Sequence, residues 1–250
     1  MKTLVRTFPL GPVLRAASAV ALATACAAFP ATASSIQVSA SPDLLIPDGN
    51  DSGTFSIINI PASTQSITDI SITLNLVGGQ DGAWNGDFYI YLAHDGYLSV
   101  LANRPGVTAT KPFGYGDNGL AQVTFDDNAL LGDFHVYQAT LNTSDTILPI
   151  TGTFQPDGRA TDPSIVALND PRTAMLSGFH GQNPEGEWRL FLADLSLGGT
   201  ARLASWELNI TTEEVLVVPE SGPGLAFLGL SVVLIGLTPR YLRRRTSPPS

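Results

Sequence analysis

The stretch GFHGQNPEGEWRLFLAD, residues 178–194, gathers the residue types of an acid–base or nucleophilic site. His180 stands beside Gly181, and the acids Glu185 and Asp194 follow it. A histidine that works with a carboxylate and a serine hydroxyl is the arrangement of a serine hydrolase. The same stretch also has the glycines and the proline of a tight turn, followed by the alternating apolar residues of a strand. The rest of the sequence must decide between a catalytic loop and a structural corner.

The sequence lacks the patterns that serine proteases and zinc enzymes need. His180-Gly181 is the only His-Gly pair, and it precedes a predicted strand, while Asp51-Ser52-Gly53 lies in an opening loop without partner motifs. There is no Gly-x-Ser-x-Gly elbow and no His-Glu-x-x-His spacing. We expect His94 at a hairpin turn and His135 in a strand, DFHVYQAT. We therefore predict that the catalytic triad is absent and that the chain is not an enzyme.

The acidic residues suggest a cation. All 22 acids lie between residues 34 and 220, together with only six basic residues. Such a surface repels the phosphates of nucleic acids and favours cations and basic partners. Calcium accepts carboxylate and carbonyl oxygens as ligands, although the spacing here is not that of an EF-hand. Calcium binding and the capping of turns or short helices both remain open for four candidates: Asp87, Asp126, Asp127 and Asp194.

Short alternating runs predict strands throughout the middle of the chain. Asp95-Gly96 stands between two such runs and predicts a hairpin. We expect a turn or short helix at 126–131, and a loose lead-in or a first strand at 34–45. Within this middle part of the chain no long helix is expected, because Pro163 and Pro171 interrupt the segment 160–175. The prediction is one all-β domain over 34–212, an antiparallel β-sandwich. Its inward residues include Ile70, Ile72, Leu74, Leu76, Phe88, Ile90, Leu92, Trp188, Leu190, Leu192, Trp206, Leu208 and Ile210.

The first 33 residues have the order of a secretory signal peptide. A basic start precedes a run of small apolar residues, 16–29, and Ala31-Thr32-Ala33 is a cleavage pattern. An N-terminal membrane anchor and lipidation at Cys26 are the alternatives. Cys26 is the only cysteine, so the mature domain has no disulfide and no thiol chemistry. The body of the protein is therefore expected to be exported.

The C-terminal tail has three parts. A linker over 213–221 contains Val218-Pro219-Glu220. An apolar transmembrane helix is predicted over 222–242. A basic cytoplasmic tail is predicted over 243–250. This order resembles the PEP-CTERM sorting signals that exosortase-type enzymes recognise, although Ser221 stands where the second proline is usual. The resemblance implies a Gram-negative bacterium that makes extracellular polysaccharide, an exosortase-type partner, cleavage near Pro219-Glu220 and delivery to the cell surface. The alternative is a permanent inner-membrane anchor with the domain facing the periplasm.

The segment FHGQNPEGEWRLFLADLSLGGTARLASWELNI resembles the closing part of the P domain (Homo B domain) of proprotein convertases, which are subtilisin-like proteases. Upstream, Gly86-Asp87, Asp95-Gly96 and Arg104-Pro105-Gly106 match its central hairpin, and the likeness covers residues 43–210. Asn85 departs from the usual histidine-aromatic run. The resemblance implies a jelly-roll-like sandwich in which the opening stretch is a corner. Its signature residues are Gly181, Gly186, Trp188, Asp194 and Trp206.

Two functions follow from this resemblance. The first is a non-catalytic module that binds a protein or an extracellular polysaccharide, with Tyr89, Tyr91, Trp84 and Tyr115 available either to stack on sugars or to pack within the fold. The second is an accessory domain that supports the folding of a secreted subtilisin-like serine endopeptidase. Neither function involves nucleic acid.

Overall fold

The computed structural model describes residues 33–79 and 81–214. Most of the predicted signal peptide, the sorting motif at 218–220 and the predicted membrane helix at 222–242 lie outside these residues. Within the described ranges, no helix has the length and apolar character needed to cross a bilayer.

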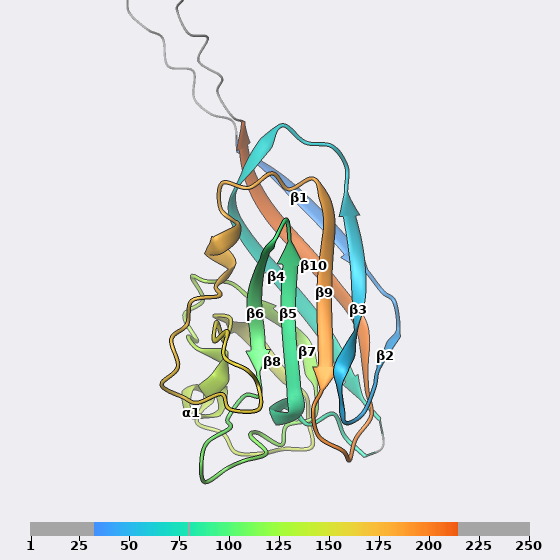
Figure 1. Cartoon of the computed structure of the whole chain (residues 1–250), viewed down its shortest axis with the longest axis vertical. Helices are drawn as coiled ribbons and strands as arrows, with labels where there is room; N and C mark the ends of the chain where they lie inside the picture. Colours follow the sequence, from blue (N-terminus) through green and yellow to red (C-terminus); the bar gives the residue numbers. More distant parts are fainter. Residues whose placement is uncertain (1–32, 80, 215–250) are drawn as a thin grey trace, which may run out of the picture. The chain divides into compact units, whose positions relative to one another are not determined.

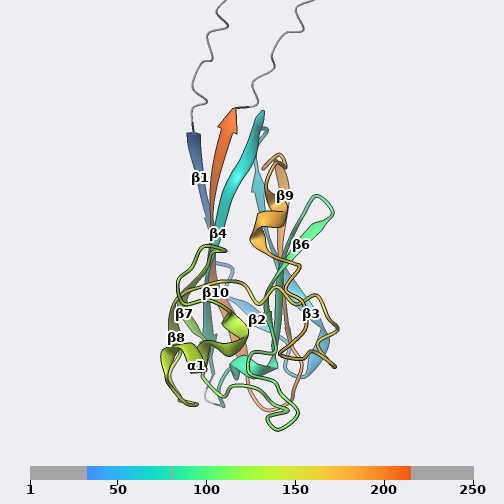
Figure 2. The ribbon, with the colours of Figure 1, turned by 90° about the vertical axis from the view of Figure 1, so that its left-hand side faces the viewer.

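The described domain consists of two β-sheets that pack face to face (Figures 1 and 2). The larger sheet has the order β1 (Ala33–Ala40), β10 (Ala201–Glu214), β4 (Gln65–Gly78), β7 (Leu120–Phe125) and β8 (Ile150–Phe154), with β2 (Leu44–Ile46) also paired to β10. The smaller sheet has the order β3 (Asn50–Ile60), β9 (Gly186–Asp194), β5 (Phe88–His94) and β6 (Tyr97–Asn103). These sheets confirm the all-β prediction. One pairing departs from it, because β7 and β8 run parallel.

The period-2 pattern of the sequence places the core between the sheets. In β5 the residues alternate between buried and half-buried, and in β4 the positions Ile70, Ile72 and Leu74 are almost fully buried. Burial of each such side chain contributes about 1.5–3 kcal/mol. Trp206 of the larger sheet donates from Nε1 to Ser56 Oγ of the smaller sheet at 2.9 Å. The two layers are therefore joined by a buried hydrogen bond as well as by apolar contact.

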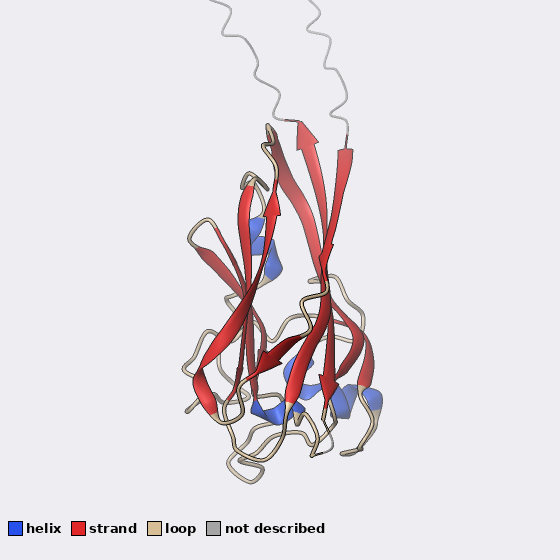
Figure 3. Ribbon diagram, turned by 90° about the vertical axis from the view of Figure 1, so that its right-hand side faces the viewer, coloured by secondary structure: helices blue, strands red, loops and turns tan. Residues whose placement is uncertain are grey.

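Short helices occupy the loops, as the ribbon coloured by secondary structure shows (Figure 3). They are η1 (Asn85–Asp87), η2 (Phe134–Val136), α1 (Tyr137–Leu141) and η3 (Leu176–Phe179). The strand predicted around His135 is wrong, because Phe134 and Tyr137 are both buried at helical spacing and Asp133 accepts a hydrogen bond from the His135 backbone at 2.9 Å. The segment 126–131 forms turns, and residues 34–40 belong to a strand.

The last strand is longer than the sequence suggested. β10 continues to Glu214, and Thr212, which is fully buried, pairs with Ile67 of β4. Residues 213 and 214, which the prediction placed in the linker, therefore belong to this strand. At the same end, Ala33 pairs with Glu213, so β1 and β10 bring the beginning and the end of the described domain side by side.

Candidate functional site

The segment 178–194 connects the two sheets. Gly181 donates to the Ile67 carbonyl at 2.8 Å, and Ile67 donates to the Gln182 carbonyl at 2.9 Å, so the segment is attached to β4 before it enters β9. Gly181 has a φ of +81° and Gly186 a φ of +108°, which residues with a Cβ rarely adopt. Within this stretch the side chain of His180 is exposed. The local geometry is that of a corner between two layers.

His94 is buried beneath this corner and does not lie at the surface of the hairpin. Its ring stacks on Trp188 with 4.0 Å between centroids. Nδ1 lies 3.0 Å from the Glu187 carbonyl, and Nε2 lies 2.8 Å from the Asn183 carbonyl. Both ring nitrogens are therefore engaged by backbone oxygens.

His135 takes part in a second buried arrangement, which we call the paired network: His135, Asp157, Arg159 and Asp133. His135 Nδ1 lies 2.8 Å from Asp157 Oδ2, and both side chains are completely buried. Arg159 contacts Asp157 at 2.9 Å and Asp133 at 2.8 Å. His135 Nε2 faces the Val107 carbonyl at 3.4 Å. In both buried histidines the ring nitrogens face carbonyl or carboxylate oxygens, where a serine hydrolase would present a serine hydroxyl.

The four candidate calcium ligands fall into two groups. Asp126 accepts from the Asn128 backbone at 2.7 Å, and Asp127 accepts from the backbones of Leu176 and Ser177 at 3.0 and 2.8 Å. These two acids hold turns. Asp87 and Asp194 lie at one end of the smaller sheet, where they are 5% and 3% exposed.

Burial governs the titration of the second group. Burial is the main cause that raises the pKa of Asp87, while a hydrogen bond from the Ser196 hydroxyl and the charge of Arg104 oppose the increase. Burial also raises the pKa of Asp194 to about 7, against the Ser196 backbone donor and with help from the charges of Asp87 and Asp48. Among the described residues, no three histidine, cysteine, aspartate or glutamate side chains are grouped as a ready metal site.

The outer face of the smaller sheet carries a row of aromatic side chains. Phe55 of β3 pairs with Phe191 of β9, and Phe191 pairs with Tyr91 of β5. Tyr91 and Phe191 stack with 4.7 Å between ring centroids, and Tyr89 lies 5.7 Å from Tyr91. The Arg189 guanidinium lies 4.6 Å from the centre of the Phe55 ring. We call these five residues the aromatic face.

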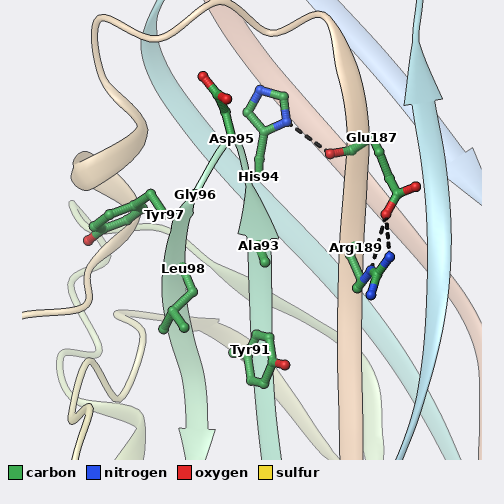
Figure 4. A pocket seen from close by; sticks show the side chains of 9 residues that line it. All are labelled: Tyr91, Ala93, His94, Asp95, Gly96, Tyr97, Leu98, Glu187 and Arg189. Carbon is green, nitrogen blue, oxygen red and sulfur yellow. Dashed lines mark hydrogen bonds and ion pairs between the residues drawn. The ribbon is translucent and has the colours of Figure 1, made fainter.

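A pocket of about 490 Å³ adjoins the aromatic face (Figure 4). Tyr91, Leu98 and Arg189 line it from β5, β6 and β9, and Glu187 binds Arg189 at 2.7 Å on one side. The other lining residues are Ala93, His94, Asp95, Gly96 and Tyr97. Apolar rings and charged groups thus lie side by side at the surface of one sheet.

The sequence identified only part of this face. Tyr89 and Tyr91 lie on it, but Trp84 and Tyr115 lie in the loops at the far end of β5, where Tyr115 packs on Tyr137 at 4.8 Å. The sequence does not indicate Phe55 and Phe191 as site residues. Their outward position follows from the alternation of β3 and β9, but their place in one row depends on the pairing of strands far apart in the sequence.

Comparison with known proteins adds only a distant likeness. No family model matches the chain, and no curated protein matches it. Among solved structures, the serine protease of Aeromonas sobria in complex with the chaperone ORF2 has 15% identity and a TM-score of 0.37, over 75% of this chain and 28% of the other. The serine protease of Aeromonas sobria in a second structure has 15% identity and a TM-score of 0.36, over 74% and 27%. The chain therefore corresponds to little more than a quarter of these structures.

Proposed function

We propose that this chain is an exported, non-catalytic module of the P/Homo B type that binds extracellular polysaccharide through its aromatic face. The observation that carries this proposal is the cross-strand row of Phe55, Phe191 and Tyr91. Flat rings with hydroxyl and charged groups beside them suit the apolar faces and peripheral hydroxyls of sugar rings. The P-domain resemblance and the sorting signal support placement of this face outside the cell.

The exposure of the row supports a binding role. Phe55 is 49% exposed, and Ile57, two residues further along β3, is 36% exposed. Leu98 of β6, at the other edge of the same sheet, is also 36% exposed. The outer face of the larger sheet is different, since a hollow there is lined mainly by small polar side chains, including Thr73 and Thr124, whose hydroxyls lie 2.9 Å apart. The exposed apolar side chains of the larger sheet, Leu45 and Val77, are aliphatic and lie on either side of Arg202. A cluster of partly exposed aromatic residues is typical of an interaction surface.

The contacts of the histidines support the absence of catalysis. A hydrolase needs a base that can take a proton from a nucleophile or water. His94 and His135 are buried with their nitrogens facing backbone or carboxylate oxygens. We expect the purified chain to cleave no peptide substrate, and hydrolysis stopped by a serine-directed inhibitor would contradict this expectation.

A glycan array with the full chain tests the binding function. We expect binding to one or more extracellular polysaccharides, and the double variant Y91A/F191A should weaken it by at least about tenfold because it removes the stacked pair. The matched control is T73A/T124A on the opposite face, which should bind like the parent. Absence of glycan binding, together with binding to a subtilisin-like protease, would instead support the accessory function.

A further inference from the structure

Three aspartates lie on the chain segments around the end of the smaller sheet where β9 finishes (Figure 1). Asp194 is the last residue of β9 and pairs with both Phe88 and Asn50. Asp87 directly precedes Phe88, and its carbonyl accepts from Leu195 at 2.9 Å. Asp48 accepts from the backbone of Gly198 in the same loop at 3.1 Å. We call Asp48, Asp87 and Asp194 the carboxylate cluster.

The cluster contains a buried oxygen without a donor. Asp87 is 5% exposed, and within the described residues its Oδ1 atom has no hydrogen-bond partner. The nearest cation is Arg104, whose Nη2 atom lies 4.0 Å away, too far for a hydrogen bond. Arg104 instead donates to the carbonyls of Pro112 and Gly86 at 3.0 and 3.3 Å. A buried acceptor of this kind needs a partner, either an ion or a water molecule, because desolvation without a partner is costly.

The buried carboxylate of Asp194 also has few hydrogen-bond donors and cations around it. It is 3% exposed, and its one hydrogen bond among the described residues comes from the Ser196 backbone at 3.3 Å. No described arginine or lysine forms a salt bridge with it. Two buried carboxylates thus share one strand end with a single distant cation.

We propose that the carboxylate cluster binds a calcium ion, with Asp87 and Asp194 as its main protein ligands and Asp48 as a more exposed third carboxylate. Calcium accepts six to eight oxygens with flexible geometry, so two carboxylates can be completed by carbonyls and water. Magnesium demands a stricter octahedral arrangement and keeps its own waters. The inference is independent of the polysaccharide proposal, because the cluster and the aromatic face share no residue.

The test is calorimetric titration of the full chain with calcium chloride, together with thermal unfolding in calcium and in chelator. We expect saturable binding and a melting temperature that rises by several degrees with calcium. D87N and D194N should each weaken calcium binding by about tenfold or more, since each removes a charged ligand. D69N, which removes one exposed carboxylate from β4, is the matched control and should bind calcium like the parent.

Two results would overturn the proposal. One is a melting temperature that does not change up to millimolar calcium, which would leave the two carboxyl groups to share a proton instead. The other is an unchanged calcium affinity in D194N. If D87N does not fold, D48N provides the second measurement, because Asp48 is exposed and its removal should still weaken binding several-fold.

Discussion

The domain has buried carboxylates in two regions, and the two regions differ in the cations that surround them. In the paired network, Asp157 and Asp133 both contact the Arg159 guanidinium within 3 Å, and His135 contacts Asp157 as well. In the carboxylate cluster, the nearest guanidinium is 4.0 Å from Asp87. Removal of a carboxylate from water is tolerated when a cation and hydrogen bonds replace the lost hydration. Within residues 33–79 and 81–214, the first region satisfies this requirement and the second does not.

The difference separates a structural role from a ligand-binding role. The paired network joins the turns before η2 to the segment after β8, because Asp133 lies before η2 while Asp157 and Arg159 follow β8. Its charges have their partners in place. The carboxylate cluster instead lies where three loops or strand ends come together, and Asp87 Oδ1 has no hydrogen-bond partner in the described part of the chain. A buried carboxylate therefore indicates a ligand-binding site only where the neighbouring residues supply too few hydrogen-bond donors and cations.

Loss of charge from the paired network should have the largest effect on stability. D157N keeps the shape of the side chain but removes the negative charge that both Arg159 and His135 contact. We expect the free energy of unfolding to fall by about 3–5 kcal/mol, because one member of a buried ion pair is removed. Urea unfolding of the full chain measures this, with D69N as the control for loss of one negative charge. A decrease below about 1 kcal/mol would mean that the network contributes little.

The carboxylate cluster should respond to pH in the opposite sense to an ordinary salt bridge. Without calcium, the pKa of Asp194 in the folded protein is about 7, above its ordinary value near 3.8, because of burial and the nearby carboxylates. The folded state then holds the proton more tightly than the unfolded state, so stability is greatest at low pH and is lost as the pH rises towards 7. In chelator, we expect the free energy of unfolding to fall by about 2–3 kcal/mol between pH 5 and pH 8.

D194N provides the comparison for this pH effect. Asparagine resembles the protonated acid and does not titrate, so the variant should lose most of the decrease between pH 5 and pH 8. At pH 8 in chelator it should be more stable than the parent, whereas D157N should be less stable than the parent at both pH values. Equal pH dependence in the parent and in D194N would show that another group causes the decrease.

The sequence predicted the strands of the two sheets better than it predicted the residues of the candidate sites. Alternation in β4, β5, β9 and β10 indicated the strands and their inward residues, because a period of two is a local property. The Asp95-Gly96 hairpin is confirmed by the pairing of His94 with Tyr97. The strand expected around His135 was wrong because Phe134 and Tyr137 are buried at helical spacing, and tertiary packing outweighs the residues' strand preference.

The roles of the four candidate aspartates were beyond the sequence. Asp87, Asp126 and Asp127 all stand next to turn-forming residue types. Composition alone therefore cannot separate Asp127, which accepts from the backbones of Leu176 and Ser177, from Asp87, whose Oδ1 has no hydrogen-bond partner among the described residues. The distinction depends on contacts between residues about fifty to a hundred positions apart. The same holds for the aromatic face, whose members come from three strands that become neighbours only in the folded sheet.

The smallest effect on the free energy of unfolding should come from an ion pair that is exposed to solvent. Lys111 binds Asp145 at 3.0 Å, and its ammonium also lies 4.7 Å from the centre of the Tyr115 ring. Both side chains of the pair are more than a third exposed, so water already solvates them and salt screens their attraction. We expect K111M to change the free energy of unfolding by less than about 1 kcal/mol. Urea unfolding at low and high salt measures this change. A decrease in the free energy of unfolding as large as that of D157N would contradict the view that burial, more than ion pairing itself, determines how much a carboxylate contributes to stability.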